Sequence, residues 1–81
     1  MRVTISLFAQ MRLDAGVSSV ALELPPGATL ASALERFYEA HPTLRAHGAS
    51  ALAAIGLEYA PLDQLLREGD EISLIPPVQG G

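Results

Sequence analysis

The sequence predicts a two-layer α+β domain in which one main helix covers one face of a sheet of four or five strands. Apolar and polar residues alternate near both ends of the chain, and one segment between them has apolar residues at helical spacing. The chain has 81 residues, 49% of them hydrophobic and 17% charged. This length suits a single domain, and the composition supplies enough apolar material for a folded core.

The first two strands are expected to pair as a hairpin. Residues 2–8 alternate between apolar and polar side chains, as a half-buried strand does. Residues 14–19 contain Asp, Gly and two Ser, which favour turns, and residues 20–24 repeat the alternation. The Pro-Pro-Gly sequence at 25–27 then ends the second strand.

The main helix is predicted to begin at Leu30, with the Thr29 hydroxyl capping its free amides. Its two faces differ in polarity. The inward face comprises Leu30, Ala33, Leu34 and Phe37, and the outward face comprises Ser32, Glu35, Arg36 and Glu39. Pro42 disfavours helical geometry at His41, so the helix should end there. A short helical turn is expected within residues 43–47.

A small hairpin is predicted next, with strands at 52–55 and 59–60 around a turn at 56–58. Three leucines that follow it are expected to cover the open end of the core: Leu62, Leu65 and Leu66. A turn at 67–70 leads into the last strand, residues 71–75. The Pro76-Pro77 pair ends this strand because proline cannot donate a backbone hydrogen bond.

The first and last strands are apolar enough to lie side by side at the centre of the sheet. Their inward sets are Val3, Ile5 and Leu7, and Ile72 and Leu74. Phe8 and Ile75 are out of phase with these sets and lie at strand ends, so both are predicted on the opposite face. Single exposed apolar residues are ordinary, but a partner surface would account for these two.

Charge and composition restrict the partners. The net charge is −4, so neither nucleic acid nor a membrane surface is an expected partner, and an acidic surface suits a basic cleft on another protein. All five basic residues are arginine, so no side-chain amine can accept an isopeptide bond. There is no cysteine for a disulfide or a thiolate metal site. The alternating N-terminal stretch does not resemble a signal peptide, and we expect a cytoplasmic location.

A self-contained active site is disfavoured in so small a chain. His41 and His47 are six residues apart without a cysteine between them, and no metal site is predicted from this spacing. Glu68, Asp70 and Glu71 form a charged turn, which differs from an acid/base pair in a cleft.

The C-terminal segment is the best candidate for the functional segment of the chain. Gly80 and Gly81 lack a Cβ, so a narrow channel on a partner could admit them. The residues after Ile75 would reach about 20 Å when extended at roughly 3.4 Å each, which would let the carboxylate react inside another protein. The alternative is a frayed terminus without a function.

Three motifs together resemble those of one known family. They are Leu7-Phe8-Ala9-x-x-Arg12 followed by Gly16, Glu68-Gly69-Asp70-Glu71, and Pro76-Pro77-Val78-x-Gly80-Gly81. With these residues the chain resembles the small subunit of molybdopterin synthase, a sulfur-carrier protein of the ubiquitin-like class. The resemblance covers essentially the whole chain and agrees in length and strand order.

This resemblance implies a β-grasp (ubiquitin-like) two-layer α+β fold, with a mixed sheet of four to five strands, one main helix and a flexible C-terminal Gly-Gly tail. Residues 1–75 would form the domain, and residues 76–81 would form the sulfur-carrying tail. The chain would then be a sulfur-donating subunit of a sulfurtransferase complex and would not be catalytic alone.

The resemblance also implies chemistry at Gly81. An adenylyltransferase similar to ubiquitin-activating enzymes would use ATP to adenylate its carboxylate, and sulfur transfer would then form a thiocarboxylate. The synthase large subunit would receive this tail, and sulfur would pass to cyclic pyranopterin monophosphate to build the molybdopterin dithiolene. No cofactor would be bound permanently. A heterotetramer of two carriers on a large-subunit dimer is the expected complex.

The resemblance assigns roles to the residues around the tail. Gly80 would allow close passage, and Val78 and Gln79 would line the channel. The expected docking collar consists of Phe8, Arg12, Ile75, Pro76 and Pro77. Arg12 can equally be a solvated surface cation. The chain departs from the family pattern at Gly56, where Asn is frequent, and at Leu74 and Ile75, where aromatic residues are frequent, which affects the expected partner packing.

Two other functions remain open from the sequence. The chain could carry sulfur for another pathway, such as thiazole synthesis, or be a ubiquitin-like modifier of target lysines, because these share the tail chemistry. It could also be an interaction domain that docks by a sheet edge, with the glycines incidental.

Overall fold

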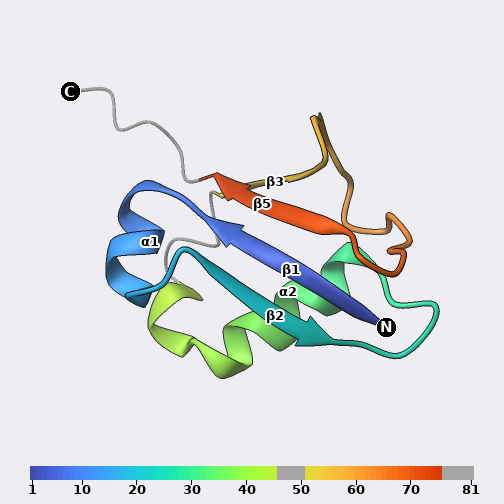
Figure 1. Ribbon diagram of the computed structural model, residues 1–81, viewed down its shortest axis with the longest axis horizontal. Helices are drawn as coiled ribbons and strands as arrows, with labels where there is room; N and C mark the ends of the chain where they lie inside the picture. Colours follow the sequence, from blue (N-terminus) through green and yellow to red (C-terminus); the bar gives the residue numbers. More distant parts are fainter. Residues whose placement is uncertain (46–50, 76–81) are drawn as a thin grey trace.

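The computed structural model describes residues 1–45 and 51–75, which form one five-stranded sheet with helices packed against it (Figure 1). The elements in chain order are β1 (Arg2–Leu7), α1 (Ala9–Ala15), β2 (Ser19–Glu23), α2 (Leu30–Ala40), the 3-10 turn η1 (Pro42–Leu44), β3 (Leu52–Ile55), β4 (Glu58–Tyr59) and β5 (Glu71–Ile75). The strands lie side by side in the order β2-β1-β5-β3-β4. The first and last strands are therefore adjacent at the centre, as predicted.

The central pair, β1 and β5, is parallel, and every other pairing in the sheet is antiparallel. Leu7 lies opposite Leu74 in this pair, so both strands end at the same edge of the sheet. The ends of β1 and β5 consequently lie next to each other. Residues 76–81, predicted as a separate tail, and residues 46–50 lie outside the described residues.

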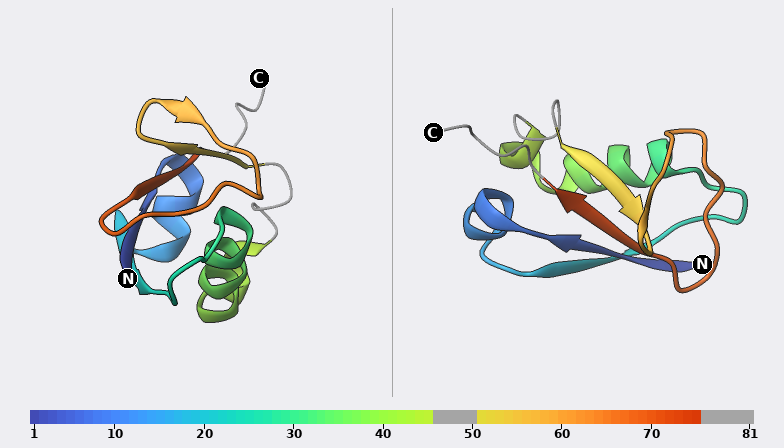
Figure 2. Two further views of the ribbon diagram at one scale, coloured as in Figure 1. Left: turned by 90° about the vertical axis from the view of Figure 1, so that its right-hand side faces the viewer. Right: turned by 90° about the horizontal axis from the view of Figure 1, so that it is seen from above.

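The core lies between the sheet and α2, which runs behind β1 and β2 in Figure 1 and is seen from two further sides in Figure 2. The strand residues predicted to point inward are all buried: Val3, Ile5, Leu7, Ile72 and Leu74. Leu30, Ala33 and Phe37 of α2 are buried against them, and Leu34 is partly buried. The alternation and the helical spacing thus identified the core correctly, because each apolar set shares one face.

Helix α2 begins and ends where the sequence predicts. The Thr29 hydroxyl accepts a hydrogen bond from the Ser32 N–H at 3.3 Å, and the Thr29 N–H donates to the Ser32 hydroxyl at 2.8 Å, which together form a capping box. The helix ends at Ala40, and the His41 ring lies 5.0 Å from the Phe37 ring. Among the described residues, no helix has the length and apolar composition that crossing a bilayer requires.

Tyr38 is a core residue that the predicted helix face omitted. Its side chain is buried beside Phe37, and the Arg45 guanidinium lies 5.6 Å from the centre of its ring. Burial raises the pKa of the Tyr38 hydroxyl, and the Arg45 charge partly opposes this shift.

Helix α1 is an element that the sequence analysis did not predict. Its C-terminal part was assigned to a turn, whereas the turn begins only at Gly16, which caps the helix with a φ of 77°. Met11 is the one buried residue of α1, so this seven-residue helix has no repeating apolar stripe. Helical periodicity cannot be recognised from a single buried position.

The prediction for the leucines after β4 is wrong for two of the three. Leu66 is buried, but Leu62 and Leu65 are 60% and 61% exposed. The segment is held mainly by its backbone: Gln64 and Leu62 carbonyls accept from the N–H groups of Leu30 and Ala31 at 2.9 Å each. These bonds satisfy free amides at the start of α2, and they leave two leucine side chains in solvent.

The acidic turn before β5 is a structural element, as predicted. Glu68 accepts from the Arg2 N–H at 3.1 and 3.2 Å, and Asp70 accepts from the Arg67 N–H at 2.7 Å. Glu71 accepts from the Ser6 hydroxyl at 3.2 Å. Glu68 and Glu71 therefore link the start of β5 to β1, and Asp70 closes the turn before that strand.

A matched pair of substitutions tests the assignment of these leucines. Leu66→Ala should lower the free energy of unfolding by about 2–4 kcal/mol, because it removes a buried side chain and leaves a cavity. Leu65→Ala should change it by less than about 0.5 kcal/mol, since that side chain is largely in water. Urea unfolding of both variants measures the difference. Equal losses would place both side chains in the core and contradict the structure.

Candidate functional site

The parallel pairing of β1 and β5 brings two predicted site residues together. Phe8 follows β1 directly, and Ile75 ends β5 one position beyond the Leu7–Leu74 pair. Phe8 is 46% exposed and Ile75 is 36% exposed, as their phase in the sequence predicts. Residues 76–81 continue from Ile75, so this apolar pair lies at the base of the C-terminal segment.

These two side chains line one hollow on the outer face of the sheet, with a volume of about 440 Å³. It is lined by Phe8, which follows β1, and by residues of β3, β4, β5 and the turn between β3 and β4: Ala54, Gly56, Leu57, Tyr59, Ser73 and Ile75. The lining contains no charged residue, and hydroxyl groups come only from Ser73 and Tyr59. Such a surface suits burial of an apolar group from a partner.

Leu57 is the most exposed of the residues of this hollow that the sequence analysis missed. It lies at the tip of the β3–β4 turn and is fully exposed. Gly56, whose φ is 65°, makes the tight turn possible. An apolar residue at a turn tip gains nothing from the fold of its own domain, and that is the signal that could have identified it. Tyr59, on the following strand, was predicted as a strand residue without a role in the site.

Arg12 does not line the hollow that contains Phe8 and Ile75. It lies on the exposed side of α1 and borders a different, shallow hollow with Leu13, Gly16, Val17 and Ser18. Its backbone N–H donates to the Phe8 carbonyl at 3.4 Å, so it is one helical turn from Phe8. The predicted collar members Pro76 and Pro77, and the predicted tail residues Val78, Gln79, Gly80 and Gly81, lie outside the described residues.

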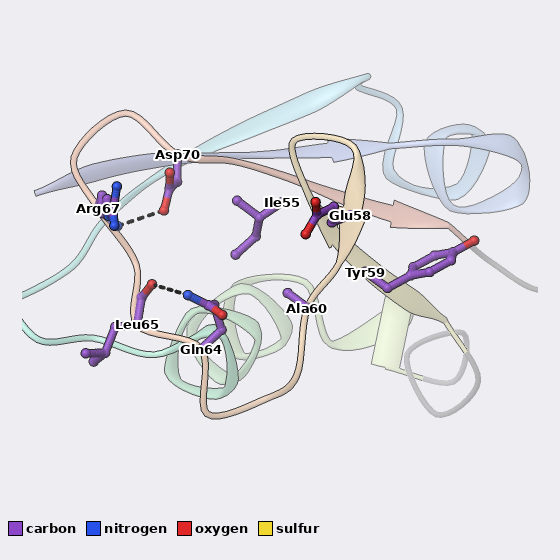
Figure 3. A pocket seen from close by; sticks show the side chains of 8 residues that line it. All are labelled: Ile55, Glu58, Tyr59, Ala60, Gln64, Leu65, Arg67 and Asp70. Atoms are coloured by element: carbon purple, nitrogen blue, oxygen red, sulfur yellow. Dashed lines mark hydrogen bonds between the residues drawn. The ribbon is translucent and has the colours of Figure 1, made fainter.

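A second hollow, of about 240 Å³, lies between the β3–β4 hairpin and the segment before β5 (Figure 3). Its lining is Ile55, Glu58, Tyr59, Ala60, Gln64, Leu65, Arg67 and Asp70. Figure 3 shows two hydrogen bonds within this lining, from the Arg67 N–H to Asp70 and from the Gln64 amide to the Leu65 carbonyl. The lining carries one cation, Arg67, and two carboxylates, Glu58 and Asp70, so it has a slight excess of negative charge and presents no cluster of cations for an anionic ligand.

The described residues contain no cluster of three or more His, Cys, Asp or Glu side chains that could hold a metal ion. His41 packs against Phe37 at the end of α2, and His47 lies outside the described residues. The apolar hollow at the tail base therefore stands out as the candidate site. Its chemistry suits a docking surface, because the lining is mostly apolar and its only polar side-chain groups are the Ser73 and Tyr59 hydroxyls, with no histidine or carboxylate beside them.

The chain matches the model of the ThiS family over residues 5–81. It is 36% identical to a protein of Chlamydomonas reinhardtii named molybdopterin synthase sulfur carrier subunit, with all of both chains covered. Among solved structures, SAMP1 from Haloferax volcanii superimposes with a TM-score of 0.90 at 31% identity, over the whole of both chains.

A further solved structure, a putative molybdopterin converting factor subunit 1 from Pyrococcus furiosus, has a TM-score of 0.86 at 28% identity. It covers 96% of this chain and 99% of its own. These matches confirm the ubiquitin-like β-grasp fold that the resemblance implied.

Proposed function

This chain belongs to the ThiS family, and on that premise we propose that it is the sulfur-carrier subunit of a molybdopterin synthase. The observation that carries the proposal is the apolar hollow at the base of a segment that ends in Gly80 and Gly81. A docking surface beside a slim tail is what a carrier needs, because the surface positions the tail and the tail reaches the acceptor. The Chlamydomonas reinhardtii relative supports the choice of pathway.

The proposed chemistry takes place at the carboxylate of Gly81. A carboxylate is a poor electrophile, so an activating enzyme first joins it to AMP from ATP and releases pyrophosphate. A sulfur donor then attacks the acyl carbon, AMP leaves, and Gly81 ends in a thiocarboxylate. This anion attacks cyclic pyranopterin monophosphate through its sulfur and displaces an oxygen substituent. Water then cleaves the bond between that sulfur and the Gly81 acyl carbon, so the sulfur stays on the substrate and the carboxylate is regenerated; two such deliveries build the dithiolene. In this scheme the chain supplies the sulfur-bearing terminus, and its partners supply the catalytic groups.

Docking in this proposal uses the hollow lined by Phe8, Leu57 and Ile75. The large subunit of the synthase would fill it with apolar side chains, while the tail enters a channel that leads to the substrate. The net charge of −4 favours a basic cleft on that partner, since complementary charge speeds encounter and fixes orientation. Arg12, on the neighbouring helix, would contact an acidic group at the rim of the interface.

Two partners therefore act on the same end of the molecule in turn. One is an adenylyltransferase similar to ubiquitin-activating enzymes, and the other is the large subunit. We propose a heterotetramer in which two carriers dock at opposite ends of a large-subunit dimer. Each carrier would leave after its sulfur is delivered and return for activation.

A second candidate function is that of a protein modifier. It is favoured by the likeness to SAMP1, whose name stands for small archaeal modifier protein 1. A modifier uses the same activated Gly81, but a lysine amine attacks it and an amide remains. This chain contains no lysine, so one copy cannot receive another through a side-chain amine. Conjugates that resist denaturant, formed when a cell extract is supplied with ATP and the activating enzyme, would favour the modifier.

Removal of Gly80 and Gly81 separates a carrier from a plain interaction domain. The shortened chain should keep its unfolding free energy and its affinity for the large subunit within about twofold, because the domain and hollow are unchanged. It should support no dithiolene synthesis, since no terminus reaches the substrate. Calorimetric titration and a product assay measure the two effects. Retained synthesis would contradict the assigned role of the tail.

A substitution at the hairpin tip tests the docking surface. Leu57→Ala should weaken binding to the large subunit about tenfold, as truncation of a central apolar anchor does. The free energy of unfolding should change little, because the Leu57 side chain is fully exposed and not part of the core. Leu62→Ala is the matched control, because that leucine is also exposed, at 60%, but lies outside the hollow. If both variants bind as the native chain does, the docking face lies elsewhere.

A further inference from the structure

Ala9 has an unusual backbone conformation directly beside the docking hollow. Its φ is 52°, and it is the only non-glycine residue in the described ranges 1–45 and 51–75 with a positive φ. Gly16, Gly27, Gly56 and Gly69 take the other positive values. A side chain in this left-handed region brings its Cβ close to the backbone, so the conformation costs free energy and persists only where the surroundings impose it.

Packing on both sides of Ala9 imposes this conformation. Leu7 is buried at the end of β1, and its N–H donates to the Ser18 carbonyl at 2.9 Å. Met11, only two residues beyond Ala9, is also fully buried. The chain must therefore leave the central strand and place a helical side chain in the core within four residues. The left-handed step at Ala9 provides that change of direction.

The same step determines the place of Phe8. Phe8 is extended, with φ −134° and ψ 158°, so it continues the alternation of β1 and puts its side chain on the outer face beside Ile75. The chain then turns away at Ala9 into α1. Phe8 thus lies between a paired strand and a turn of fixed geometry, although its side chain is nearly half exposed.

We propose that Ala9 is a positioning residue that sets the orientation of Phe8 before the partner docks. Glycine would take the same φ without strain, but it would also allow a wider range of backbone angles at this pivot. Alanine makes the backbone at this position stiffer than glycine would, at a cost in folding stability. The stiffer backbone lowers the entropy cost of ordering Phe8 on binding. This inference rests on the proposed function, since it assigns Ala9 to the interface with the large subunit.

Three variants separate positioning from stability. Ala9→Gly should unfold at the same or a higher urea concentration, because strain is relieved. In a synthase assay with thiocarboxylated carrier as the varied substrate, its KM should rise about three- to tenfold with kcat unchanged, as expected when only part of the population is competent to dock. Ala9→Asn should keep KM within about twofold, because asparagine tolerates the left-handed region while remaining stiffer than glycine.

Gln10→Gly is the matched control, one residue further along α1. It should lower stability, because glycine is unfavourable inside a helix and the Gln10–Asp14 hydrogen bond of 2.8 Å is lost. Its KM should stay unchanged, since the pivot is intact. A KM that changes in parallel with stability across the variants would overturn the inference. An unchanged KM in Ala9→Gly would also overturn it, as would a KM that rises equally in Ala9→Gly and Ala9→Asn.

A measurement without any partner keeps the inference distinct from the proposed function. NMR of the isolated protein should show contacts between the Phe8 ring and the Ile75 methyl groups that weaken in Ala9→Gly and persist in Ala9→Asn. Failure of the native chain to support the synthase would refute the proposed function. The NMR result would still decide whether Ala9 sets the orientation of Phe8. Identical Phe8 contacts in all variants would refute the role of Ala9.

Discussion

The parallel pairing of β1 with β5 is the constraint on which the rest of the structure depends. It joins the two ends of the chain at the centre of the sheet, with Ile5 opposite Ile72 and Leu7 opposite Leu74. All four side chains are buried, so a shift by one residue would turn the apolar set of one strand out of the core. The same register makes both strands end at one edge. The position of Phe8 beside the start of the tail is a direct consequence.

The two faces of the sheet have different roles because only one is covered by α2. The inner face holds the domain together without a disulfide, since the chain has no cysteine. The outer face carries small or polar residues such as Ser6 and Ser73 at its centre and apolar residues near the tail. Phe8, Leu57 and Ile75 contribute little to the core, and their position is better explained by a partner. In the proposed function, folding and docking therefore use different side chains, which lets them be tested separately.

Sequence periodicity predicted those elements whose burial repeats. Strands β1 and β5 and helix α2 each present several apolar residues to one face, so their alternation or helical spacing was evident. Helix α1 has only Met11 in the core and could not be recognised in this way. Leu62 and Leu65 were assigned to the core by hydrophobicity alone, but the backbone bonds from Leu62 and Gln64 to the start of α2 determine where that segment lies.

Those parts of the candidate site could be predicted that follow from the alternation of inward and outward side chains along a strand. Phe8 and Ile75 were identified because they break the inward pattern, and the structure brings them into one hollow. Leu57 and Tyr59 belong to the β3–β4 hairpin, which the sequence predicted, but they join that hollow only because β3 pairs with β5, and no local pattern reveals that pairing. Arg12 was grouped with Phe8 by the family resemblance, but its side chain on α1 borders a different hollow.

The intact mass of the protein, after incubation with ATP, a sulfur donor and its cognate activating enzyme, tests the central claim most directly. The account predicts a mass increase that corresponds to replacement of one oxygen by sulfur, located by fragmentation at Gly81. An unchanged mass, with an activating enzyme shown to be active on another carrier, would contradict it. The hollow beside the tail would then belong to an interaction domain that carries no sulfur.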